Sequence, residues 1–199
     1  QMILEGRVSV NGRIVKELGV KIEESDRVTV DGKEIYPQNE LIYIALNKPR
    51  KVVSTCYDPQ GRTTVLDLLP DDYKVYPIGR LDYMTEGLLL LTNDGEFANL
   101  LMHPRYEIAK TYRVAVKGYI SDQALNKLAK GVMLEDGPTL PAEVEVLERT
   151  QLKSVFLLTI REGRNRQVRR MCTKVGFPVT ELQRIQIGPV KLGNLRLGR

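Results

Sequence analysis

The apolar residues of this chain gather in short runs of strand length, separated by polar turns that contain glycine, asparagine or proline. None of these runs approaches the ~20 residues that a membrane-spanning helix needs. Apolar runs of four to eight residues between turn signals are typical of β-strands. Five segments are therefore predicted as strands, at residues 41–46, 87–92, 111–117, 142–147 and 154–161.

Three short helices are predicted between and after these strands. Asn93 and Asp94 can cap a helix that runs through Met102, and Ser121 can cap a second helix that stops at Gly131. A third helix is predicted at about residues 165–175, where apolar side chains recur at i, i+3, i+4 and i+7. The pattern indicates an α+β fold with a mixed, largely antiparallel sheet and flanking helices. We expect the helices on one face and a basic cleft across the other.

The first 36 residues differ from the rest. Residues 7–10 and 27–30 alternate in polarity, and Asn11-Gly12 is a strong hairpin-turn signal. This unit is shorter than roughly 40 residues, the length below which small domains usually need disulfides, metals or oligomerisation to be stable. Residues 37–40 break the periodicity and are predicted as a linker, which gives domains at 1–36 and 41–199.

The charge of the chain bears on its partners. Lys and Arg number 30 against 25 Asp and Glu, a net charge of +5, and much of the positive charge is concentrated. Such concentrations suit a polyanion, because neutralised phosphates release counterions. A basic solvated surface accounts for the composition equally well.

The cysteines and the single histidine exclude several chemistries. Cys56, Cys172 and His103 can build neither a disulfide framework nor a metal cluster. Cys172 falls on the apolar stripe of the third helix and is predicted to be inert core, and His103 has no acid or nucleophile partner. We expect a cytoplasmic protein with no metal and no cofactor.

Residues 79–95 are the first stretch where chemistry could reside. Asp82 follows Arg80 by two residues in a glycine-flanked loop that leads into the predicted strand 87–92. A strand fixes the position of such a carboxylate, and a nearby cation keeps it ionised. A surface ion pair at a strand edge is the alternative interpretation, since structural ion pairs look the same in sequence.

Residues 161–170 hold five arginines in ten positions. Guanidinium groups bind phosphate oxygens bidentately and stack on bases, so nucleic-acid contact is favoured over a solvated helix face. On the predicted helix, Arg166 and Arg170 point away from the apolar stripe while Arg169 lies on its margin. Tyr112, with Lys110 nearby, could offer a stacking surface, although a strand tyrosine at a core edge is the commoner case.

Together these stretches resemble the RsuA/RluB-type family of ribosomal RNA pseudouridine synthases. Residues 46–55 are similar to the family's first motif, residues 79–95 to its catalytic motif and residues 162–171 to its third motif. Residues 176–179 and 187–190 also fit, and residues 1–36 resemble the second half of an S4-type RNA-binding domain whose first helices are missing. Lys51 stands where many relatives have glycine, which could alter a turn or add a phosphate contact. Gln1, in place of Met, suggests a trimmed chain.

The resemblance implies a role for several residues. Asp82 would be the catalytic aspartate, Tyr112 the tyrosine against the target base and Arg169 the arginine paired with Asp82. Arg80 would fill the gap that a flipped base leaves. The remaining residues expected to bind the RNA substrate are Lys48, Lys110, Arg164, Arg166 and Arg170.

The function predicted on this basis is conversion of one uridine to pseudouridine in ribosomal RNA, with segment 58–62 closer to large-subunit than to small-subunit members. Asp82 could attack as a nucleophile or remove a sugar proton, and the sequence leaves both open. The partner is a structured stem-loop or an assembly intermediate, and the chain is expected to be a monomer. The alternatives are a non-catalytic ribosome-assembly factor, a small-subunit rRNA target, and an acyl-transfer enzyme that uses Cys56.

Overall fold

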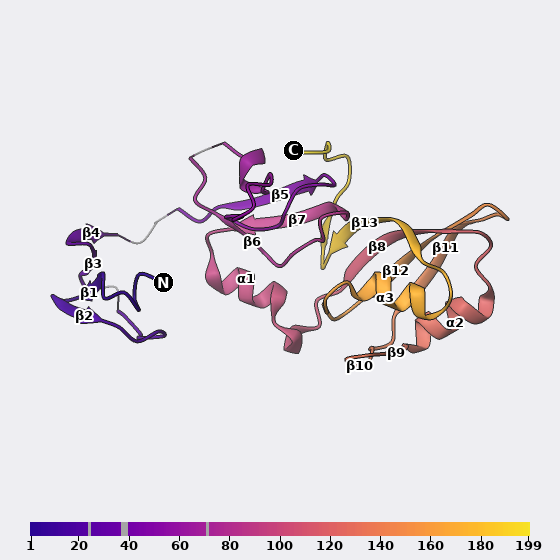
Figure 1. Cartoon of the computed structure of the whole chain (residues 1–199), viewed down its shortest axis with the longest axis horizontal. Coiled ribbons are helices and arrows are strands. Elements are labelled where there is room, and N and C mark those ends of the chain that lie inside the picture. Colours follow the sequence, from indigo (N-terminus) through magenta and orange to yellow (C-terminus); the bar gives the residue numbers. More distant parts are fainter. Residues whose placement is uncertain (24, 37–39, 71) are drawn as a thin grey trace. The chain divides into compact units, whose positions relative to one another are not determined.

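The computed structural model describes residues 1–23, 25–36, 40–70 and 72–199, which form two compact units at 1–41 and 42–199 (Figure 1). Most of the predicted linker, residues 37–39, lies outside the described residues. Among the residues described, no helix is both long and apolar enough to cross a membrane.

The first unit is a four-stranded antiparallel sheet in the order β2-β1-β3-β4. Its strands are Val8–Val10, Arg13–Val15, Val28–Val30 and Lys33–Ile35, numbered β1 to β4. The predicted Asn11-Gly12 turn joins β1 to β2, with φ of 50° and 79°, values that favour asparagine and glycine. None of the described residues of this unit is buried, in keeping with its small apolar content.

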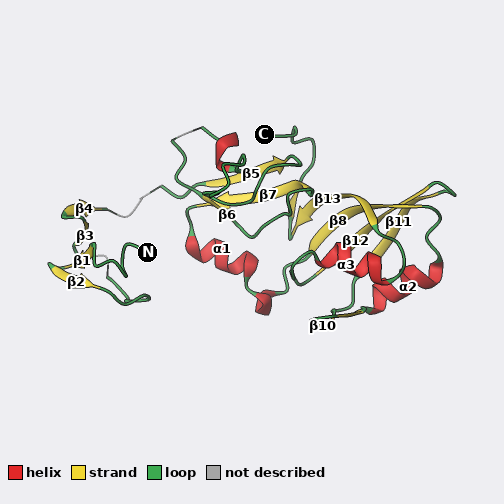
Figure 2. Ribbon diagram, in the orientation of Figure 1, coloured by secondary structure: helices red, strands yellow, loops and turns green. Residues whose placement is uncertain are grey.

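The second unit is built on an eight-stranded mixed sheet, shown as yellow arrows in Figure 2. Its main path runs β11-β12-β8-β13-β7-β5, with β14 beside β13 and β6 beside β7. The pairing of β13 with β7 is parallel and the other pairings are antiparallel, which confirms the predicted α+β class. The strands are β5 Tyr43–Lys48, β6 Tyr76–Pro77, β7 Glu86–Thr92, β8 Lys110–Lys117, β11 Glu143–Arg149, β12 Lys153–Ile160, β13 Val179–Ile187 and β14 Val190–Lys191.

Five of these strands match the predicted segments to within two or three residues at each end. The other three were not predicted: β6 and β14 have two residues each, and β13 has nine residues without an apolar run, although it lies in the middle of the sheet between β8 and β7. The remaining elements are short: a β9–β10 hairpin (Met133–Leu134 and Gly137–Pro138) and the 3-10 turns η1 (Leu66–Leu68) and η2 (Pro104–Tyr106).

Two of the three helices begin and end where their capping residues predict. In α1 (Gly95–Met102) the Asp94 carboxylate accepts from two backbone N–H groups, each at 3.0 Å, and in α2 (Asp122–Lys130) the Ser121 hydroxyl accepts one at 3.2 Å. Gly131 ends α2 with φ of 89°. The third helix, α3, spans Gln167–Lys174, slightly shorter than predicted.

The helices cover both faces of the sheet, so the expectation of helices on one face is wrong. Alternate side chains of a strand point to opposite faces. On β7, Leu88 and Leu90 pack with α1, whereas Leu89 and Leu91 pack beneath the loops of segment 49–81. The helices α2 and α3 pack on β8 and β12, and Tyr112 of β8 contacts both their cluster and that of Leu89. These two helices and segment 49–81 therefore share the face opposite α1, and a cleft between them can reach the middle of the sheet.

Candidate active site

Asp82 begins a tight turn that leads directly into β7. Its backbone carbonyl accepts from the amide of Thr85 at 2.9 Å, and β7 begins one residue later. The Asp82 side chain keeps 30% of its surface exposed, so the carboxylate is both fixed and reachable.

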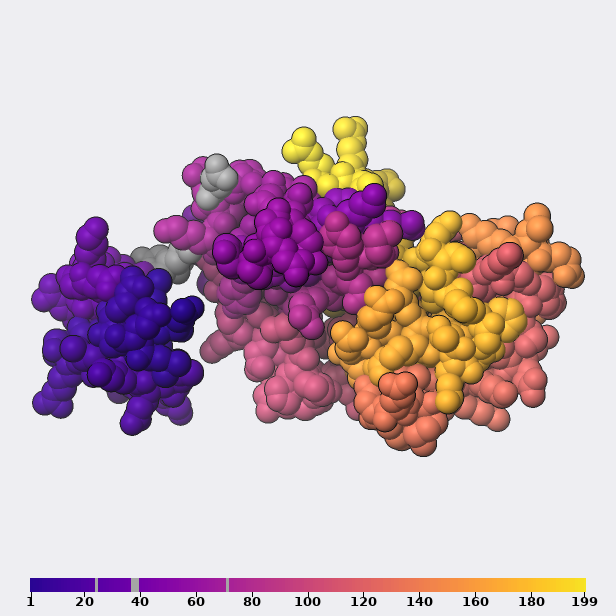
Figure 3. Space-filling view, in the orientation of Figure 1, coloured from indigo at the N-terminus to yellow at the C-terminus, as the bar shows by residue number. Residues whose placement is uncertain are grey.

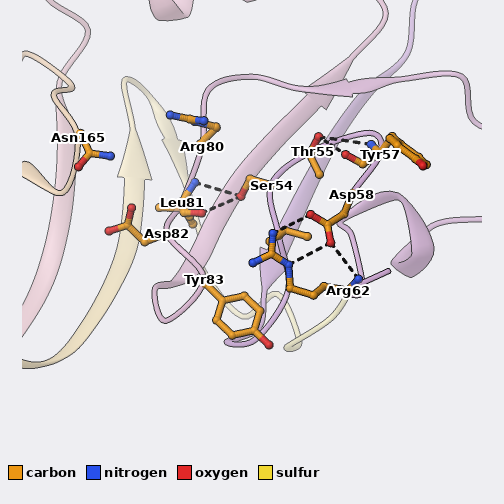
Figure 4. Close-up of a pocket in the computed structure, with 11 residues that line it drawn as sticks. Ser54, Thr55, Tyr57, Asp58, Arg62, Arg80, Leu81, Asp82, Tyr83 and Asn165 are labelled. Carbon is orange, nitrogen blue, oxygen red and sulfur yellow. Dashed lines mark hydrogen bonds and ion pairs between the residues drawn. The ribbon is translucent and has the colours of Figure 1, made fainter. Parts of the chain in front are cut away.

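Contacts from the loop after β5 hold this turn in place. The Ser54 hydroxyl donates to the Leu81 carbonyl at 2.9 Å and accepts from the Leu81 amide at 3.1 Å (Figure 4). The Lys51 amide donates to the Tyr83 carbonyl at 2.7 Å, and Lys51 itself adopts a left-handed φ of 63°. That conformation favours glycine, which agrees with the glycine that the family resemblance implies at this position.

Lys48 supports the turn from inside the protein. Its ammonium group donates to the carbonyls of Pro49 and Thr85 at 2.9 Å and approaches that of Asp82 at 3.4 Å. The residue is fully buried, and this burial lowers the pKa of Lys48 to about 8 against the opposing attraction of Asp82. The expectation that Lys48 binds RNA is wrong, because its donors are directed to protein carbonyls in the interior.

Arg169 reaches the turn from α3. Its Nε lies 4.0 Å from Asp82 Oδ2, which is an ion-pair distance and too long for a hydrogen bond. One terminal nitrogen donates to the Met84 carbonyl at 3.1 Å and to the Thr85 hydroxyl at 3.4 Å. Arg169 therefore lies on the margin of the α3 stripe and turns inward, as predicted, and it contacts both the carboxylate and its supporting turn.

Two pockets meet at Asp82 and share the wall formed by residues 80–82. The smaller, about 70 Å³, lies over the sheet, where Tyr112 of β8 and Thr85 line it together with the start of the arginine-rich segment. The larger, about 340 Å³, is on the side of the loop 53–62. The structure thus brings Asp82, Arg80 and Tyr112 together around one small pocket.

Arg80 and Arg166 are available to a ligand at this pocket. Both line its wall, and in the part of the chain that the structure describes neither side chain has an intramolecular hydrogen bond or ion pair. Arg166 also precedes α3 with a left-handed φ of 48°. These two guanidinium groups are the best placed of the predicted RNA contacts.

Arg164 and Arg170 are bound to other parts of the protein instead. Arg170 makes a bidentate pair with Asp136 of the β9–β10 hairpin, with both N–O distances 2.9 Å. Arg164 donates to Glu162 at 3.0 Å and to backbone carbonyls of the same hairpin. Figure 3 shows the orange surface of α3 packed against the darker surface of that hairpin. Lys110 lines neither pocket at Asp82 and donates to the Ile108 carbonyl at 3.0 Å.

Sequence reasoning missed several residues that build the site. Gln167 is buried, donates to Glu162 at 2.6 Å and accepts from the Arg164 amide at 3.0 Å, so it shapes the segment before α3. Ser54, Thr85 and Asn165 were also missed. Polar residues inside the motifs were the available signal, but the bonding partners of Ser54 and Thr85 lie 27 and 84 residues away in sequence.

Gly87 allows the two central strands to approach. A Cβ at this position would lie 2.3 Å from the Arg184 carbonyl oxygen and 2.7 Å from its amide nitrogen. Arg184 is itself buried, and its Nε donates to the Leu88 carbonyl at 2.8 Å. The glycine after the Asp82 turn is thus needed for the parallel pairing of β7 with β13.

Comparison with known proteins identifies the class that this fold and cleft define. A family model described as RNA pseudouridylate synthase matches residues 42–174, and the S4 domain model matches residues 1–28. The chain therefore belongs to the RNA pseudouridylate synthase family, whose reaction is an isomerisation, and it carries an S4 domain at its N-terminal side. This confirms the resemblance found in the sequence.

Individual relatives cover the whole chain. It is 49% identical over 201 residues to ribosomal large subunit pseudouridine synthase B of Bacillus subtilis, a match that covers 100% of this chain and 82% of that protein. It is 44% identical over 207 residues to an uncharacterised RNA pseudouridine synthase of Aquifex aeolicus, covering 100% and 81%. A crystal structure of pseudouridylate synthase superposes with a TM-score of 0.76 at 32% identity, covering 100% of this chain and 85% of that one.

Proposed function

We propose that this protein converts one uridine of large-subunit ribosomal RNA to pseudouridine and that Asp82 is the reacting carboxylate. The observation that carries the proposal is the placement of Asp82, which lies half-buried at the meeting point of two pockets while the backbone around it is held by Ser54, Lys51 and Lys48. The name of the Bacillus subtilis relative supports ribosomal RNA, and the large subunit in particular, as the substrate.

The reaction needs a carboxylate that is fixed before the RNA arrives. The bond between N1 of uracil and C1′ of ribose breaks, the base turns, and C5 bonds to C1′. The proton lost from C5 is balanced by one gained at N1, so no atom or electron is imported. Asp82 serves either as the nucleophile at the sugar or as the base that removes a sugar proton. Both roles require the carboxylate form of Asp82, and the Arg169 guanidinium lies 4.0 Å from that carboxylate.

The small pocket suits a uracil taken out of the RNA stack. Extruding a base costs a few kcal/mol, and contacts that replace its stacking partners offset that cost. Tyr112 and Asp82 both line the pocket, so a base held there would lie between the phenol ring and the carboxylate. Arg80 lies on the shared wall and has no partner among the described residues, so it is free to enter the gap that the base leaves.

The RNA backbone follows the cationic groove beside α3. This groove, about 430 Å³, is lined by Arg166, Arg169, Arg170 and Lys174 against a single carboxylate, that of Glu135. Arg166 lines both the groove and the small pocket, so a chain of phosphates along the groove would lead toward the small pocket at this side chain. Phosphates are therefore expected along α3, and the S4 domain provides a further RNA contact. The protein acts as a monomer in the cytoplasm.

The test is carbodiimide-probed primer extension across unmodified large- and small-subunit rRNA treated with the native chain or with Asp82→Asn. We expect one new stop, in large-subunit rRNA, that disappears with Asp82→Asn although the variant still binds the RNA. A stop in small-subunit rRNA would reassign the substrate. Full conversion by Asp82→Asn would show that Asp82 is not the reacting carboxylate. If the native chain binds free RNA and a precursor particle but converts no uridine in either, a non-catalytic assembly factor is favoured.

A further inference from the structure

The larger pocket beside Asp82 holds no part of the target uridine in the reaction proposed above. Its volume of about 340 Å³ is at the lower end of the ~300–1,000 Å³ of sites that hold small organic groups. It shares residues 80–82 with the small pocket, so whatever occupies it is next to the reacting uridine.

The charges around this pocket disfavour a phosphate. Two carboxylates, Asp58 and Asp82, and two guanidinium groups, Arg62 and Arg80, line it, so its formal charge sums to zero. The groove beside α3 is different: four cations and one carboxylate line it, and positive charge remains in excess even though Arg169 and Arg170 pair with Asp82 and Asp136. A phosphate in the larger pocket would lie near two negative side chains, whereas a neutral ring with polar edges avoids that repulsion.

Aromatic and guanidinium surfaces in the pocket are fixed in advance. Asp58 binds Arg62 bidentately at 2.7 and 3.0 Å, and the Arg62 guanidinium lies over the Tyr83 ring, 5.9 Å from its centroid. Tyr83 remains 39% exposed, and the side chain of Tyr57 nearby is 78% exposed. Unpaired bases stack on such aromatic and guanidinium planes.

The opposite side of the pocket carries a hydrogen-bonding group. Asn165 faces Asp82 and Arg80 across the pocket from Tyr83 (Figure 4). Its side chain has no hydrogen bond within the described residues, so its donors and acceptor are available to a ligand. A planar ring with Watson–Crick edge groups matches this combination of a stacking surface and an amide.

We propose that this pocket is a subsite for a second, unpaired nucleobase of the RNA, the neighbour of the target uridine, which stacks on the Tyr83–Arg62 surface and presents its edge to Asn165. This inference rests on the proposed function. It adds a recognition element: the enzyme selects its uridine partly by an adjacent base that can leave the stack.

The test uses an RNA stem-loop that contains the modified uridine, with each neighbouring nucleotide replaced in turn by 2-aminopurine or by an abasic residue. At one neighbouring position we expect 2-aminopurine fluorescence to be quenched when the full chain binds. At that position an abasic residue is expected to lower kcat/KM by about 5- to 150-fold, the ratio that corresponds to one base–aromatic stack.

Three substitutions make the test specific. In Tyr83→Leu the quenching disappears and the abasic residue causes no additional loss, whereas Tyr83→Phe retains both effects. Tyr73→Leu is the matched control, because Tyr73 is 44% exposed and does not line this pocket. Should Tyr83→Leu fold poorly, judged by circular dichroism, Tyr57→Leu replaces it, with partial loss of quenching expected.

The outcomes separate this inference from the proposed function. The subsite is overturned if an abasic residue at every neighbouring position lowers kcat/KM equally in the native chain and in Tyr83→Leu. This holds even when the uridine is converted. If the chain binds an rRNA stem-loop without converting any uridine in it, the proposed function fails, and 2-aminopurine placed in that bound stem-loop still decides the subsite. An RNA that does not bind at all overturns both.

Discussion

The Nε atom of Arg169 lies 4.0 Å from Oδ2 of Asp82, and the same guanidinium donates to the Met84 carbonyl at 3.1 Å. Arg169 belongs to α3 and Asp82 to the turn before β7, so this side chain joins the two halves of the cleft. Burial and the neighbouring Arg166 lower the pKa of Arg169, while Asp82 raises it. A residue in this position orients the turn and supplies charge at the same time.

Arg169→Ala is expected to reduce kcat by about 100-fold, the typical result of a small misplacement of a catalytic group. Arg169→Lys should recover only part of the loss, because Arg169 reaches the Asp82 carboxylate and the Met84 carbonyl with two different nitrogens, which a single ammonium nitrogen does not reproduce. Single-turnover release of tritium from [5-³H]uridine RNA measures the rate, and a filter-binding Kd separates it from affinity. Unchanged kcat in Arg169→Ala would contradict this role.

Lys48 should give the native protein a distinctive pH dependence of stability. Its pKa falls from an ordinary value of 10.5 to about 8 in the folded chain, so between these pH values the unfolded chain binds more protons. The free energy of unfolding contributed by Lys48 therefore rises with pH across this window, by at most about 1.4 kcal/mol per pH unit.

Urea unfolding of the native chain and of Lys48→Met, between pH 7 and 10.5, measures this contribution by difference. Tyrosines and exposed lysines titrate in both proteins and cancel. The two stability curves should be parallel below pH 8 and diverge above it, in favour of the native chain. Parallel curves throughout would show that Lys48 titrates normally.

Gly87→Ala is expected to disrupt the centre of the sheet. The added Cβ would lie 2.3 Å from the Arg184 carbonyl oxygen, on a residue with φ of 106°, and we expect a loss on the order of 4 kcal/mol or more in the free energy of unfolding. Gly118→Ala is the matched control: φ is 79° but the nearest atom is 3.9 Å away, so only backbone strain of about 1–2 kcal/mol applies. Equal losses in the two variants would mean that the close approach of β7 and β13 is not what requires glycine.

Elements with local signals were predictable from the sequence. Asp94 and Ser121 cap their helices through backbone amides two or three residues away, and the apolar run of β7 is buried on both faces. The strand β13 carries no such signal. Its register shifts at two points against β8, which breaks the alternation of polarity, and it contains the buried Arg184.

The candidate site was predictable to the same limited extent. The residues around Asp82 lie within one motif, but whether an arginine is free depends on partners remote in sequence. Asp136 is 34 residues from Arg170, and nothing in either local pattern indicates their pairing. In the sequence, a lysine followed by a proline looks like a surface cation. Its burial follows from the packing of the Asp82 turn against the end of β5, which no local pattern shows.

The salt dependence of RNA binding should distinguish Arg166 from Arg170. Arg166 has no partner among the described residues, so Arg166→Ala should reduce the slope of log Kd against log salt concentration by about 0.7 to 0.9, the value for one lost phosphate contact. Arg170→Ala should change the slope far less, because Asp136 already occupies its guanidinium at 2.9 Å. In an Asp136→Asn background, where that guanidinium is released, Arg170→Ala should have an effect as large as Arg166→Ala. If Arg170→Ala has the full effect with Asp136 intact, then an RNA phosphate displaces the Asp136 carboxylate from Arg170 when the substrate binds.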